Sequence, residues 1–199
     1  MKFRADKTDI KRYVEEGWWE ASKGLAEFVR ENAQRNPSGI AYRTSESQIS
    51  WNEYFHAAMG LAEQIKRETT KGGRILVWLP DSPDIHICYL ACEMAGVVTV
   101  GVGWKAGLQE LKYLSEVTGA SILLSKRNNP LGKLDDISEY LNLNSLSLED
   151  IFSNHIVDGE GANLEGSIGP SDLWFLNSTS GTTGLPKCVM QTQNRWFYF

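Results

Sequence analysis

Residues 178–187 carry the residue types in this chain that are best suited to chemistry. The segment is S-T-S-G-T-T-G-L-P-K, in which small hydroxyl side chains and glycines are followed by a single lysine. Residues of so little bulk add nothing to a hydrophobic core, but they expose backbone N–H groups and hydroxyls that can surround a polyphosphate. The lysine adds a cation that can neutralise phosphate charge. The pattern therefore predicts a phosphate-binding loop.

Two other interpretations of this segment follow from its composition. A Ser/Thr/Gly-rich hairpin tip or linker has similar residues and binds no ligand. A Walker phosphate loop requires a glycine directly before its lysine and a hydroxyl residue directly after it. Here Leu185 and Pro186 stand between the last glycine and Lys187, and the next position is Cys188. The spacing excludes the Walker loop, whereas composition alone leaves the hairpin tip open.

The order T-S-G-T-T-G-x-P-K at residues 179–187 resembles the phosphate-binding loop of the adenylate-forming enzymes. That superfamily includes acyl- and aryl-CoA synthetases, amino-acid-activating domains and luciferases. The resemblance continues upstream in I-S-W-N-E-Y at 49–54, in the apolar run at 90–102 and in E-L-K-Y-L at 110–114. The chain departs from the family pattern at Cys188, where glycine is usual, and at Gly101 and Trp104, which replace common prolines.

The resemblance implies a role for each residue of the loop. Hydroxyls and main chain would contact the β- and γ-phosphates of ATP at four positions, namely Thr179, Ser180, Thr182 and Thr183. Gly181 and Gly184 would permit a tight backbone, and Lys187 would be the catalytic residue that anchors or neutralises the phosphates. Thr179 is also a position at which the family can help to hold Mg²⁺, but the sequence identifies no set of metal ligands.

The same resemblance implies a reaction. A carboxylic acid would be joined to the α-phosphate of ATP, with release of pyrophosphate, and the acyl group would then pass to a thiol. Negative charge develops on the pyrophosphate, so donors and cations are required there. Coenzyme A is the expected acceptor, with a carrier protein as the alternative. A different possibility is a degenerate, non-catalytic module for nucleotide binding or protein interaction. The sequence does not indicate which carboxylic acid is used.

Apolar segments predict the strands that must position this loop. Near-continuous apolar runs are typical of parallel strands buried on both faces. Such runs occupy residues 74–79, 97–102 and 120–125. Apolar residues at helical spacing lie between them, which predicts a βαβαβ unit with right-handed crossovers. We therefore expect an α/β fold with a parallel sheet, to which two strands at 172–176 and 188–190 add the loop.

Helix boundaries are indicated by capping residues. Ser50 and Glu53 form a capping box that opens a helix with an apolar face. Ser82 and Pro83 are suited to the start of the next helix, which runs to Gly96. Gly119 is suited to the end of the helix after that.

The expected organisation is an incomplete N-terminal AMP-binding domain over residues 1–199. The family's adenine-binding segment and C-terminal catalytic lysine are not found, and the aromatic residues at 196–199 would be an unusual natural terminus. Further sequence is therefore expected after residue 199. The expected parts are an N-terminal arm and helix (1–36) with Trp18 and Trp19 docked on the body, a βαβ core (37–127), a surface excursion with one helix (128–169), and a truncated phosphate-loop hairpin with a helix capped by Asn194 (170–199).

Composition limits the partners. A net charge of −5 over 199 residues, without a basic stripe, argues against a nucleic-acid partner. The sequence lacks both an apolar run of about 18 residues and a signal peptide, so we expect no membrane partner and a cytoplasmic location. Cys88 and Cys92 lie near His86, but their apolar surroundings favour core packing over a metal site.

Overall fold

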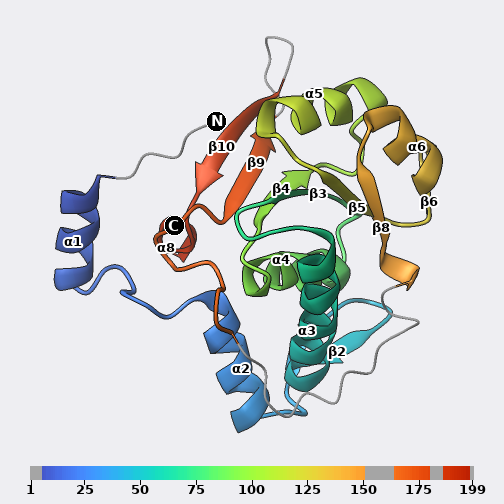
Figure 1. Cartoon of the computed structure of the whole chain (residues 1–199). Coiled ribbons are helices and arrows are strands. Elements are labelled where there is room, and N and C mark those ends of the chain that lie inside the picture. The colour runs from blue at the N-terminus through green and yellow to red at the C-terminus, as the bar shows by residue number, and fades with distance from the viewer. Residues whose placement is uncertain (1–5, 151–163, 180–185, 198–199) are drawn as a thin grey trace.

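A six-stranded sheet forms the centre of the computed structural model, which describes residues 6–150, 164–179 and 186–197 (Figure 1). The helices are α1 (Lys7–Glu15), α2 (Leu25–Arg35), α3 (Trp51–Glu68), α4 (Pro83–Met94), α5 (Leu108–Thr118), α6 (Leu134–Leu141) and α8 (Gln193–Phe197). The strands are β1 (Ile40–Arg43), β2 (Gln48–Ser50), β3 (Arg74–Trp78), β4 (Val98–Val102), β5 (Ile122–Ser125), β6 (Asn128–Asn129), β7 (Gly132–Lys133), β8 (Asn144–Ser147), β9 (Phe175–Thr179) and β10 (Lys187–Gln191).

The central sheet is mostly parallel. Its strands follow the order β10-β9-β4-β3-β5-β8. All neighbours pair in parallel except β10, which is antiparallel to β9 and forms one edge. The predicted α/β fold with a parallel sheet is therefore confirmed, and the two strands of the predicted loop hairpin belong to that sheet. Within the described parts of the chain, no helix combines the length and apolar character that crossing a bilayer requires.

Helices cover both faces of the sheet, as the double-sided burial of β3 shows. Ile75 and Val77 pack with α3 and α4 on one face, whereas Leu76 and Trp78 pack with α5 and α6 on the other. All four side chains are fully buried. Because alternate residues of a strand point to opposite faces, a strand between two helical layers must be apolar at every position. This requirement explains the continuous apolar run.

The predicted helix caps are largely confirmed. Ser50 Oγ accepts a hydrogen bond from Glu53 N at 3.2 Å, and Glu53 Oε2 accepts one from Ser50 N at 2.8 Å. Gly119 closes α5 in the left-handed region with φ 69°. Helix α4 begins at Pro83 as predicted, but Ser82 makes no capping hydrogen bond with its side chain.

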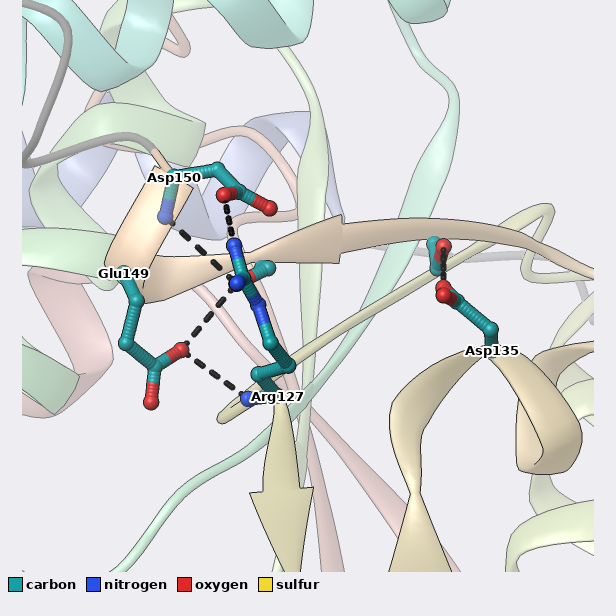
Figure 2. Close-up of polar contacts among 6 residues, drawn as sticks. Arg127, Asp135, Glu149 and Asp150 are labelled. Carbon is teal, nitrogen blue, oxygen red and sulfur yellow. Dashed lines mark hydrogen bonds and ion pairs between the residues drawn. The ribbon is translucent and has the colours of Figure 1, made fainter.

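Strand β8 was not among the predicted strands. It extends the sheet beside β5, and the following residue, Leu148, is buried. Arg127 holds the end of this strand, because its backbone N–H donates to Glu149 Oε2 at 2.9 Å and its guanidinium pairs with Asp150 (Figure 2). The short β6–β7 hairpin was also not predicted. The division of the chain into parts stays a prediction.

The N-terminal arm contains α1 and the two tryptophans that follow it. Helix α1 buries no residue and stands apart from the sheet and its covering helices (Figure 1). The rings of Trp18 and Trp19 lie 5.6 and 4.9 Å from that of Tyr13 on α1 itself. Trp18 keeps 53% of its surface exposed. Trp18 and Trp19 also line one pocket together with Leu25 and Phe28 of α2 and Asn194 of α8. The docking of the arm on the body stays a prediction.

Candidate functional site

Both ends of the predicted phosphate loop are held by hydrogen bonds. Lys187, the first residue of β10, lies opposite Thr179, the last residue of β9. Thr179 Oγ1 donates to the Lys187 carbonyl at 3.3 Å, and Ser178 Oγ donates to the Gly101 carbonyl on β4 at 3.2 Å. The structure therefore brings together the first and last predicted site residues. The others lie outside the described residues, namely Ser180, Gly181, Thr182, Thr183 and Gly184.

The loop follows the carboxyl end of a parallel strand. Strand β9 runs parallel to β4, which runs parallel to β3, so Thr179, Val102 and Trp78 end their strands at the same edge of the sheet. Ligands of open α/β sheets bind outside this edge, where connections between strands leave a crevice. The predicted loop therefore starts and ends at the edge of the sheet where such ligands bind.

Lys187 is available for an anion. Its side chain is exposed, and it takes part in none of the ion pairs among the residues that the structure describes. Its neighbour Cys188 is half-buried and packs against the core beneath the hairpin. Burial raises the pKa of the Cys188 thiol, which keeps it protonated at neutral pH. Cysteine at this position thus acts as a small apolar residue of the strand.

An aromatic cavity of about 270 Å³ lies near the opposite end of β9. Phe175 lines it and begins β9 four residues before Thr179, which corresponds to roughly 13 Å along a strand. Among the described residues that line it, none is Lys, Arg, Asp or Glu. Burial lowers the pKa of His86 despite the nearby charge of Asp81. The lining residues are Leu25, Phe28, Val29, Asn32, Tyr42, Trp51, Tyr54, His86, Tyr89, Trp174, Phe175 and Trp196.

The phenyl ring of Phe175 lies directly over the backbone of the neighbouring strand. A Cβ atom placed at Gly101 would overlap this ring, reaching 2.8 Å from Cε1 and closer still to Cζ. The same glycine accepts the hydrogen bond of Ser178 through its carbonyl oxygen. Gly101 therefore contacts β9 both near the loop and near the cavity.

A buried polar junction beyond the other end of β10 escaped the sequence analysis. Glu93 on α4 is fully buried, and its Oε1 accepts a hydrogen bond from Ala26 N at 2.9 Å. Gln193 on α8 is also fully buried, and its Oε1 accepts one from Leu25 N at 2.8 Å. Burial raises the pKa of Glu93 to about 7. The available signal was a carboxylate in the otherwise apolar segment 87–94 of α4.

The prediction that Asn194 caps the last helix is wrong. Helix α8 begins at Gln193, two residues earlier than a cap at Asn194 would place it, and Thr192 Oγ1 accepts a hydrogen bond from Arg195 N at 3.1 Å, which is the N-cap arrangement. Asn194 instead joins distant segments, because its Oδ1 accepts from Glu20 N and its Nδ2 donates to Glu20 O, both at 2.9 Å. The side-chain amide of Asn194 is therefore bonded to the distant backbone of Glu20 and is not available to cap the helix.

The cysteines of α4 belong to the core. Cys88 and Cys92 are fully buried, and burial raises the pKa of both thiols, that of Cys92 to about 12. Among the described residues, no group of three or more His, Cys, Asp or Glu side chains is arranged to hold a metal ion. His86 stacks on Tyr42 with ring centroids 4.9 Å apart.

Comparisons with known proteins cover most of the chain. A family model described as AMP-binding enzyme matches residues 29–199. Enterobactin synthase component E of Escherichia coli is 25% identical over 199 residues, covering 94% of this chain and 37% of that protein. D-alanine–D-alanyl carrier protein ligase of Bacillus cytotoxicus is 27% identical over 171 residues, covering 85% of this chain and 33% of that protein. The chain thus spans about a third of the length of these relatives.

A solved structure shows the same fold. O-succinylbenzoate coenzyme A synthetase (MenE) of Bacillus subtilis, in complex with AMP, matches with a TM-score of 0.72 and 23% sequence identity. The match covers 86% of this chain and 43% of the solved chain. At that identity the likeness shows the fold alone, which agrees with the parallel sheet described above.

Proposed function

Because the chain belongs to the AMP-binding enzyme family, we propose that the β9–β10 hairpin binds the phosphates of ATP. The observation that carries this proposal is the position of the loop. It connects Thr179 to Lys187 at the carboxyl edge of the parallel strands, inside the matched range 29–199. A hairpin tip that binds no ligand has no need to combine three features: a place at the carboxyl edge of the sheet, a sequence of small residues and an exposed lysine.

Each predicted site residue has a proposed task. Lys187 neutralises charge on the β- and γ-phosphates, because its ammonium is exposed beside the loop and has no described carboxylate partner. Thr179, Ser180, Thr182 and Thr183 supply hydroxyl and backbone donors, while Gly181 and Gly184 let the backbone approach the phosphates closely.

Thr179 fits a role in holding Mg²⁺. Its hydroxyl proton is directed to the Lys187 carbonyl, which leaves an oxygen lone pair for a hard cation. Mg²⁺ held there would neutralise part of the phosphate charge. Among the described residues, no group of three or more His, Cys, Asp or Glu side chains is arranged to hold this ion. The phosphates would therefore supply most of its negatively charged ligands.

The proposed reaction of the whole protein is ATP-dependent activation of a carboxylic acid as an acyl-adenylate, followed by transfer of the acyl group to a thiol. Coenzyme A is the first candidate acceptor, as in the reaction named for the solved O-succinylbenzoate coenzyme A synthetase. A carrier protein is the second candidate, favoured by the similarity to D-alanine–D-alanyl carrier protein ligase. Acyl transfer to coenzyme A and to a purified carrier protein, measured side by side, separates the two.

A non-catalytic module is the alternative of a different class. It would bind a nucleotide or a protein partner without forming an adenylate. ATP–pyrophosphate exchange separates it from the enzyme, because exchange requires the adenylate to form and reverse. The exchange is measured with a panel of carboxylic acids that includes aromatic acids, amino acids and fatty acids.

The decisive variant is Lys187→Ala in the protein that carries this chain. We expect exchange to fall by roughly 10- to 100-fold, because a charge-assisted contact to phosphate is lost. Lys133→Ala is the matched control, since Lys133 is an exposed lysine in the remote β6–β7 hairpin. Exchange unchanged in Lys187→Ala would remove the role of this lysine. Failure of the unaltered protein to exchange with any acid, while it still binds ATP, would favour the non-catalytic module.

A further inference from the structure

The pairing between β4 and β9 ends before the β9–β10 hairpin does. The last paired residues of the two strands are Gly101 and Asn177, two residues before the end of β9. The remaining residues of β9, Ser178 and Thr179, still pair with β10, which forms the edge of the sheet (Figure 1). Beyond Asn177 the hairpin is therefore a ribbon of two strands. Because such a ribbon is only marginally stable when isolated, its position depends on further contacts.

The hydroxyl of Ser178 supplies a contact of this kind. Ser178 Oγ donates a hydrogen bond to the Gly101 carbonyl at 3.2 Å, and the serine is half-buried. The side chain thereby bonds to β4 at the point where the backbone pairing with β4 has ended. A hydroxyl has a single proton, so this bond uses the donor of Ser178 and leaves none for a phosphate. The geometry therefore assigns Ser178 to the sheet rather than to a ligand.

The acceptor of this bond is held firmly. Gly101 is buried, and β4 is paired with β3 on one side and with β9 on the other. Val77 of β3 lies opposite Gly101. The ring of Phe175 covers the place where a Cβ atom of residue 101 would stand. Because the Gly101 carbonyl belongs to a strand inside the sheet, a hydrogen bond to it fixes the donor as well.

The strand pairing carries this restraint to the predicted site residues. Directly opposite residues of two paired strands share a face, and successive residues alternate between the faces. Ser178 lies opposite Cys188, which packs against the core beneath the hairpin. The next pair, Thr179 and Lys187, points to the other face, and Lys187 is exposed there. Fixing the first pair therefore fixes the backbone from which the lysine extends.

We propose that Ser178 is a positioning residue for the phosphate loop: its hydrogen bond to the Gly101 carbonyl fixes the end of the hairpin against β4, and thereby holds Thr179 and Lys187 in place for the phosphates. We call this hydrogen bond the anchoring bond. Its effect on ATP rests on the proposed function of the hairpin, whereas its effect on the hairpin itself does not. Without the anchoring bond, the two-stranded end of the hairpin is free to move away from β4 together with Lys187.

The test uses variants of matched chemistry in the protein that carries this chain. Ser178→Ala removes the anchoring bond, and Ser178→Thr keeps a hydroxyl at the same position. Ser125→Ala is the control, because Ser125 Oγ also donates to the carbonyl of a neighbouring strand, that of Trp78, at 2.6 Å. Those two residues lie on β5 and β3, which β4 separates from β9. The control therefore removes a similar bond at a distance from the hairpin.

Calorimetric titrations with ATP, pyrophosphate and AMP measure the effect on the proposed site. AMP lacks the β- and γ-phosphates that the loop is proposed to bind. We expect Ser178→Ala to weaken the binding of ATP and of pyrophosphate by roughly three- to tenfold, which corresponds to one neutral hydrogen bond. The affinity for AMP should not change. Ser178→Thr should bind all three ligands as the unaltered protein does, and so should Ser125→Ala, although the latter lowers the melting temperature.

Amide hydrogen exchange tests the anchoring bond without a ligand. The segments 177–179 and 187–189 should exchange faster by roughly three- to tenfold in Ser178→Ala than in Ser125→Ala, because only the first variant frees the end of the hairpin. Equal exchange of these segments in the two variants would overturn the anchoring bond.

The two measurements separate this inference from the proposed function. If the unaltered protein binds neither ATP nor pyrophosphate, the proposed function fails, and hydrogen exchange still decides on the anchoring bond. If it binds both, an unchanged affinity in Ser178→Ala would overturn the positioning role. An equal loss of affinity for AMP would also overturn it, because the effect would then not be specific to the phosphates at the loop.

Discussion

The two ends of the β9–β10 hairpin are built in opposite ways. At the loop end, Lys187 is exposed, and the residues between Thr179 and Lys187 are S-G-T-T-G-L-P, five of which are Ser, Thr or Gly. At the other end, the residues after β10 are almost fully buried, with Thr192, Gln193 and Asn194 exposed by only 1%, 0% and 3%. Each of these three accepts or donates a hydrogen bond through its side chain. Lys187 at one end is therefore exposed to solvent, whereas the other end is buried and fixed by side-chain hydrogen bonds.

The two ends also differ in how far their contacts reach along the chain. Thr179 and Lys187 are eight residues apart, and they are joined by a turn. Gln193 bonds to a residue 168 positions away, and Glu93 to one 67 positions away. Local contacts leave a motif in the sequence, whereas contacts of this range leave only isolated residues.

The largest change in stability is expected for a variant of Glu93, which lies at the buried end of the hairpin. The folded pKa of Glu93 is about 7, above its ordinary value of 4.5, so the folded protein binds more protons between these values. Stability therefore falls as pH rises through this window, by roughly 3 kcal/mol in all. Glu93→Gln should abolish this loss and make the variant more stable than the parent at pH 8, but not at pH 4. Urea unfolding at several pH values measures the difference. Parallel pH dependence in both proteins would contradict the comparison.

A second variant acts on the strand that contacts both ends. Gly101→Ala places a methyl group against the Phe175 ring, so we expect a loss of about 2 kcal/mol from overpacking. Gly103→Ala is the matched control, because no atom lies within 4 Å of its added Cβ. Thermal unfolding of the two variants gives the measurement. Equal melting temperatures would show that β4 and β9 are not packed as described.

A third variant lies remote from the hairpin. Ser50→Ala removes the capping box of α3 and should cost about 1 kcal/mol. The described elements that pack most closely against α3 are α4, α2, β2 and β1 rather than β9 or β10, so ATP affinity should be unchanged. Denaturant unfolding and calorimetric titration with ATP give the two values. A loss of affinity would mean that the two ends are not independent of the rest of the fold.

The smallest effect is expected on the surface. Arg127→Ala removes an ion pair with Asp150 in which both side chains are more than half exposed, at 59% and 56% (Figure 2). Exposed pairs contribute little, so the loss should stay below about 0.5 kcal/mol. The backbone hydrogen bond from residue 127 to Glu149 is retained. A loss comparable to that of Gly101→Ala would mean that the edge strand β8 depends on this pair.

The sequence predicted those parts of the fold whose causes are local. The apolar runs of β3, β4 and β5, the capping box at Ser50 and the glycine at 119 all follow from neighbouring residues. Strand β8 was missed because N-S-L-S contains a single apolar residue. Its place in the sheet depends on pairing with β5 and on the burial of Leu148, neither of which is visible in the segment itself.

In the candidate site, too, local features could be predicted from the sequence and long-range contacts could not. The loop was found from its residue types and order, and the structure joins its two ends, Thr179 and Lys187. The residues between them stay predictions. The junction at Glu93 could not be predicted, because the sequence does not show which distant amides a buried carboxylate will cap. The prediction for Asn194 failed for the same reason, since its partner at Glu20 lies 174 positions away.

The most direct test is a titration of the protein with Mg²⁺ and ATP in which the NMR chemical shifts of the backbone amides are measured. We expect the largest shift changes at Ser178, Thr179 and Lys187, with smaller changes at the buried residues after β10. Lys187→Ala should shift the binding curve to higher ATP concentration. Shifts that centre on the aromatic cavity and leave the hairpin unchanged would contradict the central claim, as would the absence of any binding.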